Sequence, residues 1–154
     1  YWGGEGGRTY HHTAPINALY GLHEALVVLF EEGQQAAIVR HARLHEAFVA
    51  GVEAAGLKML VAEPDRLPQL NTVLVPNGVD EAAVRAQVLK AWDLELGAGL
   101  GPLKGKVWRI GLMGASATPW HVRLCLTALC EALTAQGFKA DIKAALSAMD
   151  ARLA

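Results

Sequence analysis

The sequence lacks the features that mark several broad classes of protein. No apolar run reaches the roughly 18 residues that a membrane-spanning helix requires. The net charge is −1, so no basic surface is expected for nucleic acid. Only 19% of the residues are charged, below the usual fraction of about 25%, which suggests that a partner covers part of the surface. No signal-peptide pattern opens the chain, and we expect a cytoplasmic protein.

Cysteines and complete sets of metal ligands are also scarce. The two cysteines, Cys125 and Cys130, face different sides of an expected helix and cannot form a disulfide within it. We interpret them as small apolar core residues in a reducing compartment. His41 and His45 have a spacing that could face one metal ion, but no third ligand is evident, so no metal site is expected.

What the chain does have is 53% hydrophobic residues, enough for one globular core, in a pattern that mixes helices with strands. One helical stripe runs from Ile16 to Phe30, with Thr13 as its predicted cap and Pro15 in its first turn. We predict an α+β fold, with a mainly antiparallel four-strand sheet covered by helices on one face. The strands are expected at 57–61, 71–75, 94–96 and 107–112, and further helices at 38–52, 81–91, 119–133 and 142–153.

The first eight residues contain four glycines and no initiator methionine. Such a segment cannot build a regular element, so we interpret it as a loop belonging to something larger. We therefore expect this sequence to be part of a longer chain.

Arg109 is the most informative single residue, because it interrupts an otherwise apolar strand pattern over 106–113. An arginine stays charged and is not buried without a partner. Its planar fork matches a carboxylate or a phosphate, and the glycine-rich turn at 97–102 gives a small group room to approach. Two interpretations stay open: a structural ion pair with an Asp or Glu, or an anchor for a small carboxylate substrate.

A second polar segment, residues 9–17, places hydroxyl and imidazole side chains just before the first expected helix. The N-terminus of a helix favours anions, so Tyr10 and Thr13 could donate hydrogen bonds to a phosphate there. The alternative is a polar helix cap in which Thr13 alone does the capping. Composition by itself favours the cap.

Longer motifs add a resemblance to a known family. Residues 9–15 resemble the Tyr-His-His-Thr-x-Pro segment of alanine–glyoxylate and serine–pyruvate aminotransferases, and residues 99–114 resemble a second segment of the same enzymes, which contains an Arg-Ile-Gly run. The segment at 71–76 is also similar, and the two motifs stand at the family's separation. These enzymes are class V, fold-type I proteins that depend on pyridoxal 5′-phosphate. The resemblance covers essentially the whole chain.

The resemblance implies specific roles. Arg109 matches the arginine that holds the substrate carboxylate, and Tyr10 and Thr13 match residues that bind the cofactor phosphate of the other subunit of a homodimer. Residues 1–32 would form an interdomain loop and linking helix, and residues 33–154 the small C-terminal domain. The substrates implied are alanine or serine as amino donor and glyoxylate or a similar small 2-oxo acid as acceptor.

The resemblance also implies that the catalytic lysine lies elsewhere. In this family the lysine that binds the cofactor precedes the Tyr-His-His-Thr segment, in a Ser/Gln-Lys context. All six lysines of this chain follow that segment, and none has that context. A carbonyl cofactor needs such an amine. We therefore expect this chain to be the C-terminal portion of an aminotransferase, without its large N-terminal domain and inactive alone.

Two alternatives remain beside the aminotransferase. A cysteine desulfurase of the same class would need a nucleophilic cysteine on a loop before the arginine strand, and none lies between Gly97 and Arg109. A non-catalytic α+β domain could instead use Arg109 to hold a small acid.

Overall fold

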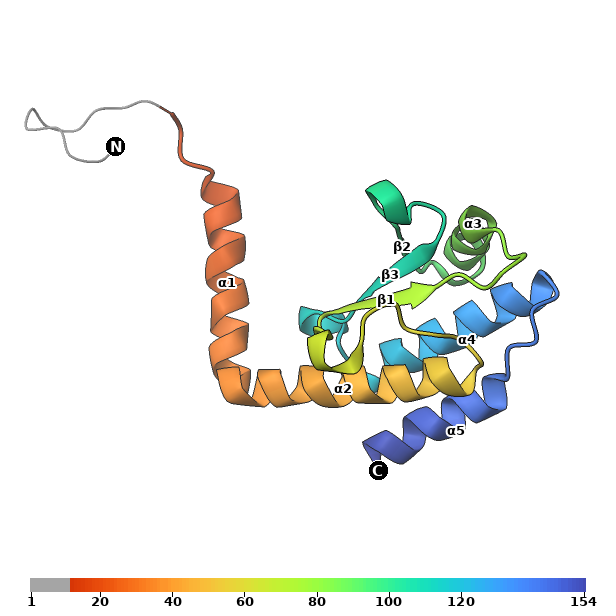
Figure 1. Ribbon diagram of the computed structural model, residues 1–154. Helices are drawn as coiled ribbons and strands as arrows, with labels where there is room; N and C mark the ends of the chain where they lie inside the picture. The colour runs from red at the N-terminus through yellow and green to blue at the C-terminus, as the bar shows by residue number, and fades with distance from the viewer. Residues whose placement is uncertain (1–11) are drawn as a thin grey trace, which may run out of the picture. The chain divides into compact units, whose positions relative to one another are not determined.

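The computed structural model describes residues 12–154, and the chain separates into two units between Ala37 and Ile38 (Figure 1). The first unit contains α1 (Ile16–Glu32) and the start of α2 (Gln34–Ala54). Gly33 lies between these helices with a φ of 89°, a conformation that glycine adopts at low cost. The sequence-based domain division at 32/33 stays a prediction.

Helix α1 differs from its prediction at its start. Its N-cap residue is Pro15, and no side chain makes a capping hydrogen bond there, so the expected cap by Thr13 is wrong. The fixed φ of proline suits the start of a helix, but its ring supplies no acceptor for the free N–H groups there. No residue of α1 is buried.

The second unit combines the rest of α2 with three strands and three further helices. Its helices begin at side-chain caps: the Asp80 carboxylate accepts the backbone N–H groups of Ala82 and Ala83 at 2.9 and 3.0 Å, and Thr118 Oγ1 accepts that of His121 at 3.2 Å. The elements are β1 (Leu70–Leu74), α3 (Glu81–Trp92), β2 (Gly97–Ala98), β3 (Val107–Gly111), α4 (Pro119–Ala135) and α5 (Ile142–Leu153), with 3₁₀ turns at Glu63–Asp65, Gly101–Leu103 and Gly114–Ser116.

The sheet is antiparallel, with β3 in its centre and β1 and β2 at its edges. The α+β class and the antiparallel pairing are confirmed, but within residues 12–154 the sheet has three strands where four were predicted. The segment predicted as a strand at 57–61 forms a single bridge between Met59 and Val73. The strand predicted at 94–96 is instead the two-residue β2, slightly further along the chain.

One face of the sheet packs on the helices (Figure 1). Val73 and Trp108 face each other across β1 and β3, and both belong, with Ile110, to the buried core that α2 to α5 complete. The Trp108 indole is fully buried, and its N–H donates to the carbonyl of Glu81 at 3.2 Å. Because side chains alternate along a strand, Arg109 and its cross-strand neighbour Thr72 lie on the other face.

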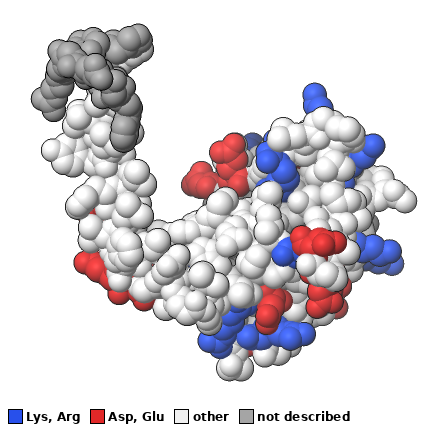
Figure 2. Space-filling model, turned by 60° about the vertical axis from the view of Figure 1, so that its left-hand side comes forward, with Lys and Arg blue, Asp and Glu red and all other residues white. Residues whose placement is uncertain are grey.

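None of the helices within residues 12–154 has both the length and the apolar character needed to cross a membrane. On the face shown in Figure 2, basic and acidic side chains lie among each other, and neither sign forms a continuous surface. Large uncharged areas separate them, in line with the low fraction of charged residues.

Candidate anion-binding site

Arg109 occupies the centre of the sheet, on the face that the helices leave open. Thr72 of β1 is its neighbour on one side and Gly97 of β2 its neighbour on the other. Arg109 itself is partly exposed, whereas Trp108 and Ile110 on either side of it are buried. The strand therefore places Arg109, partly exposed, on the face opposite the buried Trp108 and Ile110.

The Arg109 guanidinium has a backbone partner. Its Nε–H donates to the carbonyl of Ala98 at 2.7 Å, which uses one of the five N–H groups of the fork. Within residues 12–154 Arg109 forms no side-chain ion pair, whereas three other arginines of the second unit do: Arg66 with Glu53, Arg85 with Glu81 and Arg123 with Asp150. The structural ion pair considered from the sequence is therefore absent from the described part of the chain.

The segment beside Arg109 is rich in glycines, which carry no side chain. A Cβ atom on Gly97 would lie 3.0 Å from the carbonyl oxygen of Arg109 and 3.3 Å from its Cβ. A Cβ on Gly99 would overlap the carbonyl oxygen of Leu103, so the turn after β2 closes tightly. The glycine-rich segment noted in the sequence thus lies beside the arginine, as expected.

The second predicted group of residues lies in the first unit or outside the description. Tyr10 is not among the described residues. Thr13 is exposed and precedes α1, beyond the N-cap residue Pro15. Thr13 and Arg109 belong to different units of the chain.

The two histidines with metal-like spacing bind protein groups on separate segments. His45 Nδ1 lies 2.7 Å from Oδ1 of the buried Asn71 in β1, and His41 Nε2 accepts the backbone N–H of Gly114 at 3.2 Å. No group of three or more potential ligands occurs within residues 12–154. No local pattern in the sequence points to the role of Asn71, because its partner lies 26 positions away on α2.

Both cysteines are buried in α4. Burial raises the pKa of Cys125 to about 12, with a smaller contribution from Cys130. Burial, and then the charge of Asp141, raises the pKa of Cys130 to about 11. Neither thiol is suited to act as a nucleophile near neutral pH.

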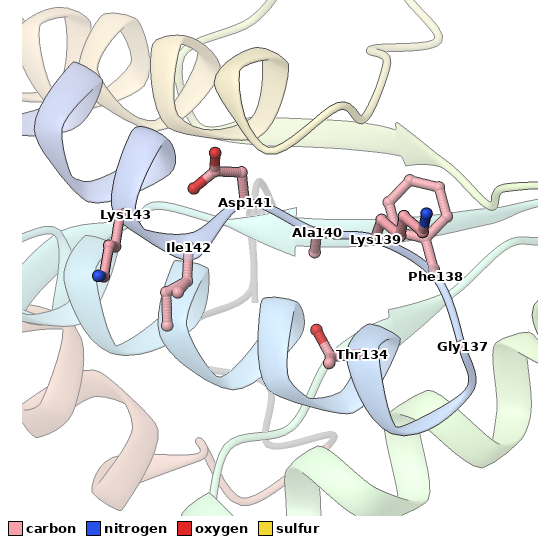
Figure 3. A pocket seen from close by; sticks show the side chains of 8 residues that line it. All are labelled: Thr134, Gly137, Phe138, Lys139, Ala140, Asp141, Ile142 and Lys143. Carbon is pink, nitrogen blue, oxygen red and sulfur yellow. The ribbon is translucent and has the colours of Figure 1, made fainter.

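A hollow of about 520 Å³ lies where α4 ends and α5 begins (Figure 3). Two of its polar side chains bond to the backbone of the helices: Thr134 donates to the carbonyl of Cys130 at 2.8 Å, and Asp141 accepts the N–H of Ala144 at 2.9 Å. Because these two side chains already have backbone partners, the Arg109 face of the sheet is the stronger candidate site.

Comparisons with known proteins point in one direction. No family model matches the chain. It is 42% identical over 149 residues to an alanine–glyoxylate aminotransferase of Drosophila melanogaster, which covers 96% of this chain and 37% of the relative. It is 35% identical over 129 residues to a (S)-ureidoglycine–glyoxylate transaminase of Bacillus subtilis, covering 84% of the chain and 30% of the relative.

The fold gives the same result. A crystal structure of pyridoxamine–pyruvate aminotransferase from Mesorhizobium loti matches with a TM-score of 0.90 and 33% identity, over 95% of this chain and 38% of that one. This chain therefore spans well under half the length of the proteins it resembles, in sequence and in structure.

Proposed function

From the homology of this chain to the C-terminal portion of glyoxylate aminotransferases, we propose that it serves as that portion of a pyridoxal-phosphate transaminase. The reaction proposed is transfer of an amino group from alanine or serine to glyoxylate or a similar small 2-oxo acid. The relatives' names support this substrate class, since they include both alanine–glyoxylate and serine–glyoxylate aminotransferases.

The proposal depends mainly on the contacts and the position of the Arg109 side chain. Its guanidinium is held at Nε by the carbonyl of Ala98, has no carboxylate partner within residues 12–154, and stands on the open face of the sheet. We propose that its terminal nitrogens bind the carboxylate of the amino-acid or 2-oxo-acid substrate in bidentate fashion. The small neighbours Gly97 and Thr72 suit a small substrate.

Pyridoxal phosphate would supply an electron sink at the substrate's α-carbon. Of this chain's residues, Thr13 and Tyr10 are the proposed ligands of its phosphate. Thr13 suits that role because it is exposed and lies just ahead of α1, and the N-terminus of a helix favours an anion. A hydroxyl so placed can donate to a phosphate oxygen. We propose that both residues act on the cofactor of a second subunit, in a homodimer.

The lysine that holds the cofactor is proposed to lie in a preceding large domain. None of the six lysines of this chain stands in the sequence context that such a lysine has. The desulfurase alternative is not favoured, because both cysteines are buried in α4 with raised pKa values. A non-catalytic acid-binding domain is not favoured by the aminotransferase relatives.

The test is Arg109→Lys in the full-length protein. Lysine keeps the charge and loses the planar fork, and a charge-assisted pair is worth about 1.5–3 kcal/mol. The apparent affinity for alanine and glyoxylate should therefore fall by about tenfold or more. Steady-state kinetics and binding of a small carboxylate inhibitor would measure it.

Arg85→Lys is the matched control, because Arg85 pairs with Glu81 within α3 and is not part of the sheet that carries Arg109. It should leave both substrate affinities unchanged. Unaltered affinities in Arg109→Lys would mean that Arg109 does not bind the substrate carboxylate, and the proposed site would be lost.

A further inference from the structure

Residues 97 and 98 contact Arg109 in two different ways. The carbonyl of Ala98 accepts the Nε–H of Arg109 at 2.7 Å, across 11 positions of sequence. Gly97 is the direct partner of Arg109 in the antiparallel register. Strand β2 has no other residues, so its whole length lies against the arginine strand.

The hydrogen bond to Ala98 controls the orientation of the guanidinium. The fork is planar, so a bond at Nε fixes the direction in which the two terminal nitrogens point. A backbone carbonyl neutralises none of the charge, unlike a carboxylate partner. The contact therefore orients Arg109 while keeping its charge and its terminal N–H groups for a ligand.

Gly97 is a glycine for reasons of space and not of backbone conformation. It is not among the glycines with positive φ. An added Cβ would lie 3.0 Å from the carbonyl oxygen and 3.3 Å from the Cβ of Arg109, and 3.7 Å from its Nη2. The first two distances are tighter than ordinary van der Waals contact, so the arginine or strand β2 would have to move.

We infer that Gly97 and the Ala98 carbonyl are positioning elements that set the plane of the Arg109 guanidinium for a bidentate carboxylate. This inference rests on the proposed function, since it assumes that Arg109 is the substrate anchor. It adds a role for β2, which is to orient the Arg109 side chain. A methyl group at residue 97 should displace the fork without removing any charge.

The test is Gly97→Ala in the full-length protein, with Gly111→Ala as control. Gly111 lies on the same strand and the same face as Arg109, but an added Cβ there would lie 2.9 Å from the flexible end of Met113 and no nearer than 4.0 Å to the carbonyl oxygen of Gln69. Gly97→Ala should raise KM for the 2-oxo acid by about tenfold, within the roughly hundredfold that a 1 Å misplacement can cost. Its kcat should change little, and Gly111→Ala should leave KM unchanged.

A double-mutant cycle separates positioning from general damage. In an Arg109→Lys background the fork is already lost, so Gly97→Ala should have little further effect on KM. Equal effects of Gly97→Ala in both backgrounds would overturn the inference. If Arg109→Lys alone leaves KM unchanged, the proposed function fails and the inference fails with it. If only Arg109→Lys raises KM, the anchor stands and the positioning role is wrong.

A second measurement needs no substitution, in case Gly97→Ala does not fold. In ¹⁵N-arginine-labelled wild-type protein, the Arg109 Nε–H should exchange slowly with water, because it is bonded to Ala98. Addition of glyoxylate should shift the terminal Nη signals and leave the Nε–H protected. Exchange at the rate of a solvent-exposed arginine would overturn the inference.

Discussion

At the scale of single residues, Trp108 and Arg109 show how one strand serves two purposes. Trp108 points into the helix-covered core and is fully buried. Arg109, the next residue, points to the open face and binds the carbonyl of Ala98. The rigidity of the proposed anchor therefore derives from the packing of its immediate neighbour.

The cysteines provide a prediction at this scale. The thiolate is the reactive form, and burial raises the pKa values of Cys125 and Cys130 to about 12 and about 11. We expect neither to react with iodoacetamide in the native protein at pH 8, and both to react in guanidinium chloride. Mass spectrometry after each treatment measures this. Rapid native alkylation at either site would contradict the burial of that cysteine.

The same shifts predict a dependence of stability on pH. A thiol whose pKa is raised by folding stays protonated while the unfolded chain loses its proton, so its contribution is complete below pH 9 and declines as the pH rises toward 11. A variant with both cysteines replaced by alanine lacks this titration. The difference in free energy of unfolding between the two proteins should shrink over that interval, and a constant difference would count against it.

At the scale of elements, the helices were more predictable than the strands. Helical spacing and the caps Asp80 and Thr118 are local signals, and they placed α3 and α4 correctly. Strand pairing depends on distant partners. Apolar residues around Met59 predicted a strand, yet that segment forms one bridge, while the pair Gly97–Ala98 has low strand propensity and still forms β2 against β3.

The features of the candidate site also fall into those that a local sequence pattern predicts and those that depend on distant residues. That Arg109 shares a strand face with Val107 and Gly111 follows from alternation along its strand, which is a local property. Its hydrogen bond to Ala98 and the pairing of His45 with Asn71 are tertiary contacts, for which no spacing rule exists. Thr13 was predicted as a cap because its side chain suits that role, but Pro15 occupies the N-cap position.

Helix packing gives a further prediction. Gly51 of α2 is buried, and an added Cβ would overlap Cδ1 of Leu126 in α4 and lie 3.1 Å from the carbonyl oxygen of Ala145 in α5. Glycine to alanine inside a helix ordinarily stabilises by about 1 kcal/mol. Here overpacking should outweigh that gain and lower the free energy of unfolding by about 1–3 kcal/mol, measured by urea denaturation.

A Leu126→Val background provides the control for this change, because valine lacks the Cδ atoms that an alanine at residue 51 would meet. The cost of Gly51→Ala should be smaller there. An identical cost in both backgrounds would show that Leu126 does not limit the approach of α2 to α4.

At the scale of the whole molecule, the chain is short beside its relatives. It covers 37% of the Drosophila relative and 38% of the Mesorhizobium structure. It supplies the proposed carboxylate anchor but none of the lysines in the context that the cofactor requires. If the substrate anchor and the lysine that binds the cofactor lie in different parts of the protein, neither part alone should catalyse transamination.

We therefore expect the 154-residue chain, expressed alone and mixed with pyridoxal phosphate, to show no transamination of alanine with glyoxylate. Borohydride reduction should attach no stoichiometric cofactor to any of its lysines. The full-length protein, treated identically, should carry one cofactor per chain, and circular dichroism should establish that the short chain is folded. Specific labelling of one lysine in the short chain would refute the proposed division.

Strand β3 also constrains how this protein can vary over evolutionary time. Successive side chains of the strand serve opposite faces, so a one-residue insertion or deletion ahead of Trp108 would turn the indole outward and the guanidinium into the apolar core. Such a change would remove stability and ligand binding together. Single substitutions along β3 leave the alternation of its side chains intact, whereas a change in its length does not. Related proteins should therefore differ in the length of the loops on either side of β3 and keep the number of residues within the strand.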